Sequence, residues 1–208
     1  MTARTRTRTL LVRSTLAALL GAGLAGCGIR ATEVPTDFGP APSRVPCVST
    51  AADVATQAHT DTVPEGIFLV CGSQLVRVDR AVRLSAAAAE DRVSVAQALL
   101  SELREPPTEA EEQAGFTSSV TGAPKVTGPR GGDPATALRI STPPERMTPY
   151  ELAQIVCTFA QSVAAERDEA VVLGGPGGSP LRRYECTEEL RARPGTVPAP
   201  AETVNPDS

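Results

Sequence analysis

Apolar positions along the middle of the chain recur with two different spacings, which predict an alternation of strands and helices. Short runs rich in β-branched and aromatic residues indicate strands, whereas apolar residues at positions 0, 3, 4 and 7 indicate helices with one buried face. The predicted strands cover residues 67–71, 75–78, 137–140, 171–173 and 181–186. The predicted helices carry two apolar stripes, Ala96, Leu99, Leu100 and Leu103 in the first and Leu152, Ile155, Val156, Phe159 and Val163 in the second.

Capping signals place the helix boundaries. Thr108 and Glu111 form a capping box that opens a short helix, which Gly115 closes. A second capping box, Thr148 and Glu151, opens the later main helix. The resulting order is ββα(α)βαββ. It predicts an α+β domain over residues 64–190, with a small mixed or antiparallel sheet and two main helices packed on one face.

The segments that flank this domain differ from it in composition. Residues 28–63 are rich in proline, threonine and serine and have no apolar period, so residues 27–63 are predicted to be a tether that begins with Cys27. Residues 191–208 are also proline-rich and are predicted to be a disordered tail.

The first 26 residues combine four arginines with a short apolar run from Leu16 to Ala25. This pattern is typical of an export signal, and the run is too short to cross about 30 Å of hydrocarbon. Leu24-Ala25-Gly26-Cys27 then matches a lipobox and resembles the processing site of bacterial lipoproteins. Residues 1–26 are therefore predicted to be a lipoprotein signal peptide, and Cys27 is predicted to carry the lipid, with palmitate among its acyl chains.

Lipidation at Cys27 predicts anchoring to the extracytoplasmic face of the cell membrane. Two or three acyl chains, at about 0.8 kcal/mol per buried CH₂, hold a protein stably. The chain has a formal net charge of −4, and removing residues 1–26 takes away four arginines and no acidic residue, which leaves a charge near −8. Such an acidic protein is not expected to bind nucleic acid.

Four cysteines remain after Cys27, namely Cys47, Cys71, Cys157 and Cys186. An even number in an exported chain predicts two disulfides. A zinc site would need closely spaced cysteines or histidines, whereas these cysteines lie more than twenty residues apart and the single histidine, His59, lies in the tether. No metal and no cofactor are predicted.

Two disulfide patterns are compatible with the predicted elements. The first joins Cys71 to Cys157 and Cys47 to Cys186, and the second joins Cys47 to Cys71 and Cys157 to Cys186. Cys157 lies on the flank of its helical stripe, from which a neighbouring strand can be reached, and this favours the second pattern. Either pattern holds Cys47 to the domain and leaves residues 28–46 as a free tether of roughly 22–26 Å.

Several of these elements occur together in a known family. Leu103 is followed by Pro107-Thr108-x-x-Glu111 and Ala114-Gly115-Phe116, and later by the segment from Met147 to Val156. The chain resembles the GerM-type domain (GerMN, sporulation and spore germination), which also occurs in actinobacterial lipoproteins of the LpqB family, over roughly residues 65–175. The resemblance implies an extracytoplasmic, non-enzymatic domain and supplies no catalytic residues. The large propeller of LpqB proteins has no counterpart in the sequence.

Three polar or glycine-rich clusters could carry chemistry. The segment 174–178 lacks the Gly-Lys-Ser/Thr of a phosphate loop and is predicted to be a hairpin turn. Acidic residues in the first turn of the short helix could hold a cation, but such residues commonly complement the helix dipole; they are Glu109, Glu111 and Glu112. Arg182 and Arg183 could form an anion-binding edge or a solvated strand face.

No nucleophile has a base nearby in the sequence, so the chain is not expected to be an enzyme. The expected function is that of an interaction module in the cell envelope, bound to an envelope protein or a wall component. Two alternatives are an accessory regulator of a sensor kinase, by analogy with LpqB, and a cell-wall-modifying enzyme. A pocket with converging acids of perturbed pKa would favour the enzyme.

Overall fold

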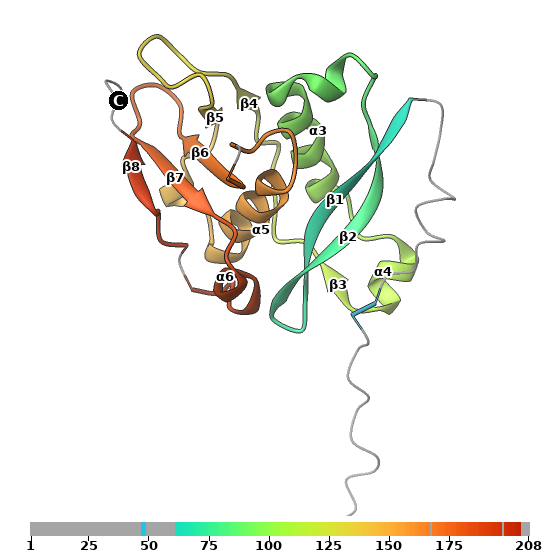
Figure 1. Ribbon diagram of the computed structural model, residues 1–208. Coiled ribbons are helices and arrows are strands. Elements are labelled where there is room, and N and C mark those ends of the chain that lie inside the picture. Colours follow the sequence, from blue (N-terminus) through green and yellow to red (C-terminus); the bar gives the residue numbers. More distant parts are fainter. Residues whose placement is uncertain (1–46, 49–60, 167, 197, 205–208) are drawn as a thin grey trace, which may run out of the picture. The chain divides into compact units, whose positions relative to one another are not determined.

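The computed structural model describes residues 47–48, 61–166, 168–196 and 198–204, over which the chain forms helices and two separate sheets (Figure 1). The helices are α3 (Arg92–Arg104), α4 (Glu109–Gln113), α5 (Pro149–Ala160) and α6 (Glu188–Ala192), and two short 3₁₀ turns are η1 (Ala88–Glu90) and η2 (Pro144–Arg146). The predicted α+β class is confirmed. The predicted signal peptide and Cys27 lie outside the described residues.

The strands divide into two sheets, where the sequence pattern predicts one. The first sheet has the order β2 (Gln74–Arg83), β1 (Thr62–Cys71), β3 (Phe116–Thr117). The second has the order β4 (Val126–Thr127), β5 (Leu138–Ile140), β6 (Ala170–Gly174), β7 (Leu181–Glu185), β8 (Glu202–Val204). The β5–β6 pair is parallel, and the other described pairs are antiparallel.

Helix α5 separates the two sheets and packs against both (Figure 1). Its side chains bind the edge of β1 at Phe68, next to Val70 and Cys71, which pair with β3. Thr158 Oγ1 accepts a hydrogen bond from the Phe68 amide at 3.0 Å, and Gln154 donates to the Phe68 carbonyl at 2.9 Å. Because these side chains take the place of a neighbouring strand, the sheet does not continue past this edge.

The β1–β2 hairpin is longer than its sequence pattern indicates. Cys71 pairs with Gln74, so the turn consists of Gly72 and Ser73 alone. Both have positive φ, +55° and +72°, as a type I′ turn requires.

Both predicted helical stripes are buried, with one correction. Leu99, Leu100 and Phe159 have no exposed surface. Val163 was predicted to continue the second stripe, but α5 ends at Ala160 and Val163 is 48% exposed. Gln161 caps the helix outside helical geometry, so Val163 falls in the following turn.

Both predicted capping boxes are present. Thr108 Oγ1 accepts from the Glu111 amide at 3.3 Å, and the Glu111 carboxylate accepts from the Thr108 amide at 2.7 Å. Thr148 and Glu151 make the same reciprocal contacts at the start of α5. These local bonds satisfy amides that have no partner within the helix.

The disulfides are Cys47–Cys71 and Cys157–Cys186, the second of the two patterns considered. The first fixes Cys47 at the turn end of the β1–β2 hairpin, where its amide also donates to the Ala114 carbonyl at 3.3 Å. The second joins the buried helix α5 to the segment between β7 and α6.

The predicted disordered tail is wrong for most of its described length. Residues after 190 complete α6, and β8 then pairs antiparallel with β7, so that Val204 lies opposite Leu181. The strand is stabilised by tertiary pairing, since β7 would otherwise expose its backbone groups along this edge. Composition alone does not reveal such pairing.

Candidate functional site

A cleft of about 490 Å³ lies where two loops and three strands of the second sheet meet. The β4–β5 loop contributes Arg130 and Asp133, and β5 contributes Arg139. The remaining lining comes from the β6–β7 turn and from strands β7 and β8, namely Gly177, Gly178, Ser179, Pro180, Leu181, Thr203 and Val204, together with Gly131 of the β4–β5 loop. This volume lies within the usual range for small-ligand sites.

The base of the cleft is a nearly buried ion pair between Arg139 and Asp133. Each side chain is 7% exposed, and the guanidinium Nε and Nη2 each donate to a different Asp133 oxygen at 2.7 Å. The hydrogen bonds from Arg139 are the main reason why the pKa of Asp133 falls to about 2. Asp133 is therefore ionised at neutral pH, and the pair carries no net charge.

Arg139 also holds the β6–β7 turn in place. Its Nη1 donates to the Gly175 carbonyl at 2.9 Å and to the Ser179 carbonyl at 3.1 Å. The guanidinium thus joins the β4–β5 loop to the glycine-rich turn. The main role of this buried cation is to shape the cleft, because its bonds are taken up by protein groups.

Arg130 stands at the rim of the cleft and is exposed. Its amide donates to Asp133 Oδ2 at 2.8 Å, which fixes the backbone of the loop. Within the described ranges, its guanidinium has no hydrogen-bond or ion-pair partner. It lies beside Gly177, where an added Cβ would come within 3.9 Å of Arg130 Nη1.

The floor of the cleft is aliphatic. Leu181 packs with Ala137, Val172 and Val204 in a small cluster separate from the main core. Tyr184, three residues along β7, belongs to the main core, so Leu181 faces the opposite side of the sheet. The cleft therefore lies on the face of the second sheet that is turned away from the main core.

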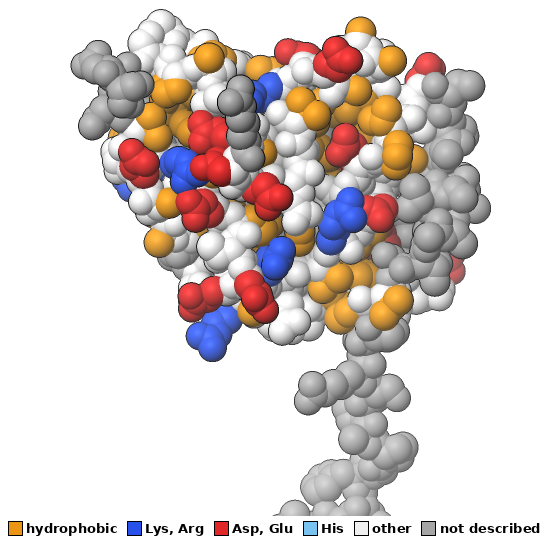
Figure 2. Space-filling model, in the orientation of Figure 1, with side chains coloured by type: hydrophobic (Ala, Val, Ile, Leu, Met, Phe, Trp, Pro, Cys, Tyr) orange, Lys and Arg blue, Asp and Glu red, His pale blue; other side chains and the backbone are white. Residues whose placement is uncertain are grey.

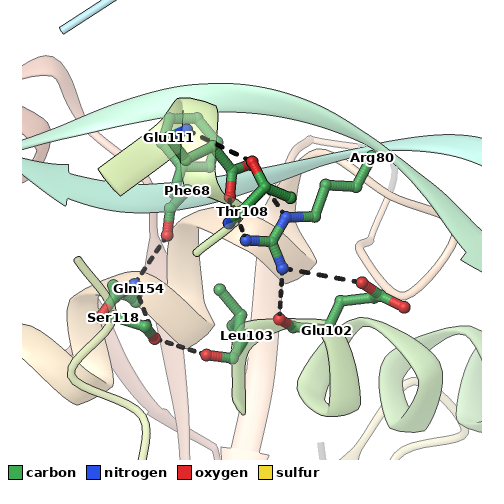
Figure 3. A network of polar contacts seen from close by, with 8 residues as sticks. All are labelled: Phe68, Arg80, Glu102, Leu103, Thr108, Glu111, Ser118 and Gln154. Atoms are coloured by element: carbon green, nitrogen blue, oxygen red, sulfur yellow. Dashed lines mark hydrogen bonds and ion pairs between the residues drawn. The ribbon is translucent and has the colours of Figure 1, made fainter. Parts of the chain in front are cut away.

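Glu111, one of the three acids considered as a cation site, instead forms a buried ion pair (Figure 3). Its carboxylate accepts hydrogen bonds from Arg80 Nε at 3.1 Å and from Arg80 Nη2 at 2.5 Å, and both side chains are 3% exposed. Arg80 also donates to the Glu102 backbone carbonyl at 2.9 Å. No group of three or more metal-ligating side chains occurs in the part of the chain that the structure describes.

The network in Figure 3 continues through polar side chains that join α5 to neighbouring segments. Gln154 donates to the Phe68 carbonyl and to Ser118 Oγ, and accepts from the Ser119 amide at 2.7 Å. Ser118 in turn donates to the Leu103 carbonyl. These contacts satisfy buried backbone groups. The network holds two acids beside Arg80, because Glu102 Oε2 lies 3.7 Å from Arg80 Nη1, and burial raises the pKa of Glu102.

The other sequence candidates have structural partners. Arg183 pairs with Glu166, Asp168 and Glu185, and these acids raise the pKa of Arg183, chiefly through the hydrogen bond that Arg183 donates to Glu185. Arg182 Nε lies 3.3 Å from a Glu145 carboxylate oxygen. Because both guanidiniums face acids of the protein itself, this strand is a poor anion-binding edge. His59 lies outside the described residues.

Residues 175–178 lie in the turn between β6 and β7, as predicted, whereas Gly174 is the last residue of β6. The sequence pattern does not predict that this turn lines a cleft. It also does not predict the roles of Arg130, Asp133 and Arg139 in that cleft. Their positions in sequence carry no local signal, because the cleft arises only when the β4–β5 loop, the turn and β8 come together.

Within the described residues, Val48 and Val163 are the large hydrophobic residues classed as exposed. On the face shown in Figure 2, acidic and basic side chains are interspersed and hydrophobic ones form small groups. In the described part of the chain, no helix is both long and apolar enough to cross a membrane.

Comparisons with protein-family models, with curated proteins and with solved structures return no match. The resemblance to GerM-type domains therefore rests on its sequence elements alone.

Proposed function

We propose that this protein is a lipid-anchored binding module on the extracytoplasmic face of the cell membrane, with Cys27 as its anchor and the cleft beside Arg139 as its binding site. The N-terminal arginines, the apolar run and the lipobox support the anchor. The cleft is the feature that carries the binding role.

The two disulfides support an extracytoplasmic location. Cys47–Cys71 and Cys157–Cys186 use all four cysteines that follow Cys27. Disulfides persist in oxidising compartments and are rare in the cytosol. Cys27 would then be the one cysteine that is left for acylation.

The charges of the cleft support binding in preference to catalysis. A general acid or base needs a pKa near the working pH and access to the substrate. Asp133 has a pKa of about 2 and accepts hydrogen bonds from two nitrogens of Arg139, Nε and Nη2. It is a positioning group for the loop, and Arg130, whose guanidinium has no hydrogen bond or ion pair among the described residues, is a charged side chain available to a ligand.

The anchor is tested by expressing the full chain in a bacterium that processes lipoproteins. The wild type should remain in the membrane fraction after a high-salt wash, and its intact mass should exceed that of residues 27–208 by a lipid group. Cys27→Ser should appear in the soluble export fraction or as uncleaved precursor. Gly28→Ser, next to the same site, is the control that should keep the lipid. A wild-type protein with a free Cys27 thiol would contradict the proposal.

A further inference from the structure

The cleft carries a net positive charge in an acidic protein. Among its lining residues, Arg130, Asp133 and Arg139 are charged, and the last two neutralise each other. Counted over the described lining, Arg130 therefore leaves one net positive charge, whereas the whole chain has a formal net charge of −4. A negatively charged ligand group is favoured at this position, and a cation is disfavoured.

The turn beside Arg130 allows the backbone of a ligand to approach closely. Gly177 has a φ of +66°, and an added Cβ at Gly178 would meet nothing within 4 Å. Among the described residues, the rim at Gly178 is therefore open. The bonds from Arg139 to the Gly175 and Ser179 carbonyls hold the turn in this open shape. The site is thus preformed, which lowers the entropic cost of binding.

The opposite side of the cleft offers aliphatic surface and a strand edge. Leu181 and Val204 provide apolar floor, and β8 is the last strand of its sheet. An extended peptide can add its backbone to such an edge, with alternate side chains turned toward the face of the sheet. Arg130 is placed to receive a carboxylate from the same segment, since it lines the same cleft.

We propose that this cleft binds a short extended peptide that bears a free carboxylate, with Arg130 pairing to the carboxylate and Leu181 and Val204 contacting an aliphatic side chain. The assignment rests on the proposed binding function and names its ligand class. A guanidinium and a carboxylate form two parallel hydrogen bonds, which gives the interaction direction as well as strength. Phosphate could bind the same guanidinium, so the test includes it.

The test is a nuclear magnetic resonance titration of the full acylated chain in detergent micelles. The probes are acetyl-Val-Val-Ala with a free carboxylate, the same peptide as its carboxamide, and inorganic phosphate. The amide signals of Gly177, Gly178 and Thr203 should shift and saturate with the carboxylate peptide. The carboxamide should bind about tenfold or more weakly, as the loss of a charge-assisted bond predicts.

Arg130→Gln should lower the affinity for the carboxylate peptide by a similar factor and leave the affinity for the carboxamide peptide unchanged. The control is Arg146→Gln, which removes the same charge from an exposed arginine outside the lining residues. It should bind like the wild type. Both variants should unfold at the wild-type temperature, because both side chains are exposed.

Three outcomes would overturn the assignment. The first is that the peptide does not saturate the site up to about 10 mM, which would be an affinity too weak for a specific site. The second is that the carboxylate and carboxamide peptides bind with equal affinity. The third is that phosphate binds in a way that depends on Arg130 while the peptide does not bind. Each would leave the lipid anchor untouched, because the mass and fractionation experiment on Cys27 decides that separately.

Discussion

Two buried arginines each join segments that are far apart in the chain. Arg80 of β2 reaches Glu111 of α4 and the backbone of α3, and Arg139 of β5 reaches the β4–β5 loop and the β6–β7 turn. Removing one partner of such a pair leaves a buried charge without a countercharge, and this lowers the free energy of unfolding strongly. The loss is much larger than the stability that the intact pair adds over a pair of apolar residues. These single residues are therefore sensitive positions.

Glu111→Gln should destabilise the domain by about 3–5 kcal/mol, because the nearly buried Arg80 then lacks a countercharge at its main contact. Chemical denaturation of the variant gives this free energy of unfolding. Glu112→Gln is the control, since Glu112 is the next residue of α4 and is exposed. Equal stability of the two variants would mean that the Arg80–Glu111 pair is not formed.

At the scale of elements, α5 is the central support of the fold. Nine of its twelve residues are buried, from Leu152 to Ala160, because both sheets pack against it. An apolar stripe predicts one buried face, and here polar residues such as Gln154 and Thr158 are buried as well. They are tolerated because each bonds to the backbone of β1.

Phe159→Ala should cost about 3–5 kcal/mol, the usual range for removing a fully buried aromatic ring. Val163→Ala, four residues later and 48% exposed, should change stability by about 0.5 kcal/mol or less. Denaturant unfolding of both variants measures the difference. Similar losses at both positions would mean that the helix continues beyond Ala160.

At the scale of the whole molecule, the ends of the described chain are tied to its middle. The Cys47–Cys71 bond holds the N-terminal side to the first sheet, and Cys157–Cys186 together with β8 holds the C-terminal side to α5 and β7. These links close loops in the chain, and closing a loop costs conformational entropy on folding. Once the disulfides have formed, they reduce the conformational entropy of the unfolded state and so stabilise the folded one.

Deleting residues 198–208 should lower the Tm, because it removes β8 from β7 and uncovers Leu181. In a domain of this size, each kcal/mol lost lowers the Tm by about 2–4 °C. Deleting residues 205–208 alone is the control, since it leaves β8 intact. Thermal unfolding followed by circular dichroism measures both. An unchanged Tm in the longer deletion would support the disordered tail that the composition predicts.

The sequence by itself determined the features that depend on neighbouring residues. The two capping boxes and the apolar stripes of α3 and α5 involve residues within about two helical turns of each other. The β1–β2 hairpin starts from a turn of two adjacent residues, Gly72 and Ser73. Their interactions are encoded in local residue types and spacing, and the even number of cysteines after Cys27 likewise predicts two disulfides.

Only the tertiary structure decided the division into two sheets, the pairing of β8, the Arg80–Glu111 contact and the cleft beside Arg139. Each joins residues that are far apart in the chain or depends on a strand with little apolar pattern of its own. Such contacts form because a buried charge, amide or strand edge must find a partner, and which partner lies within reach is set by packing around α5.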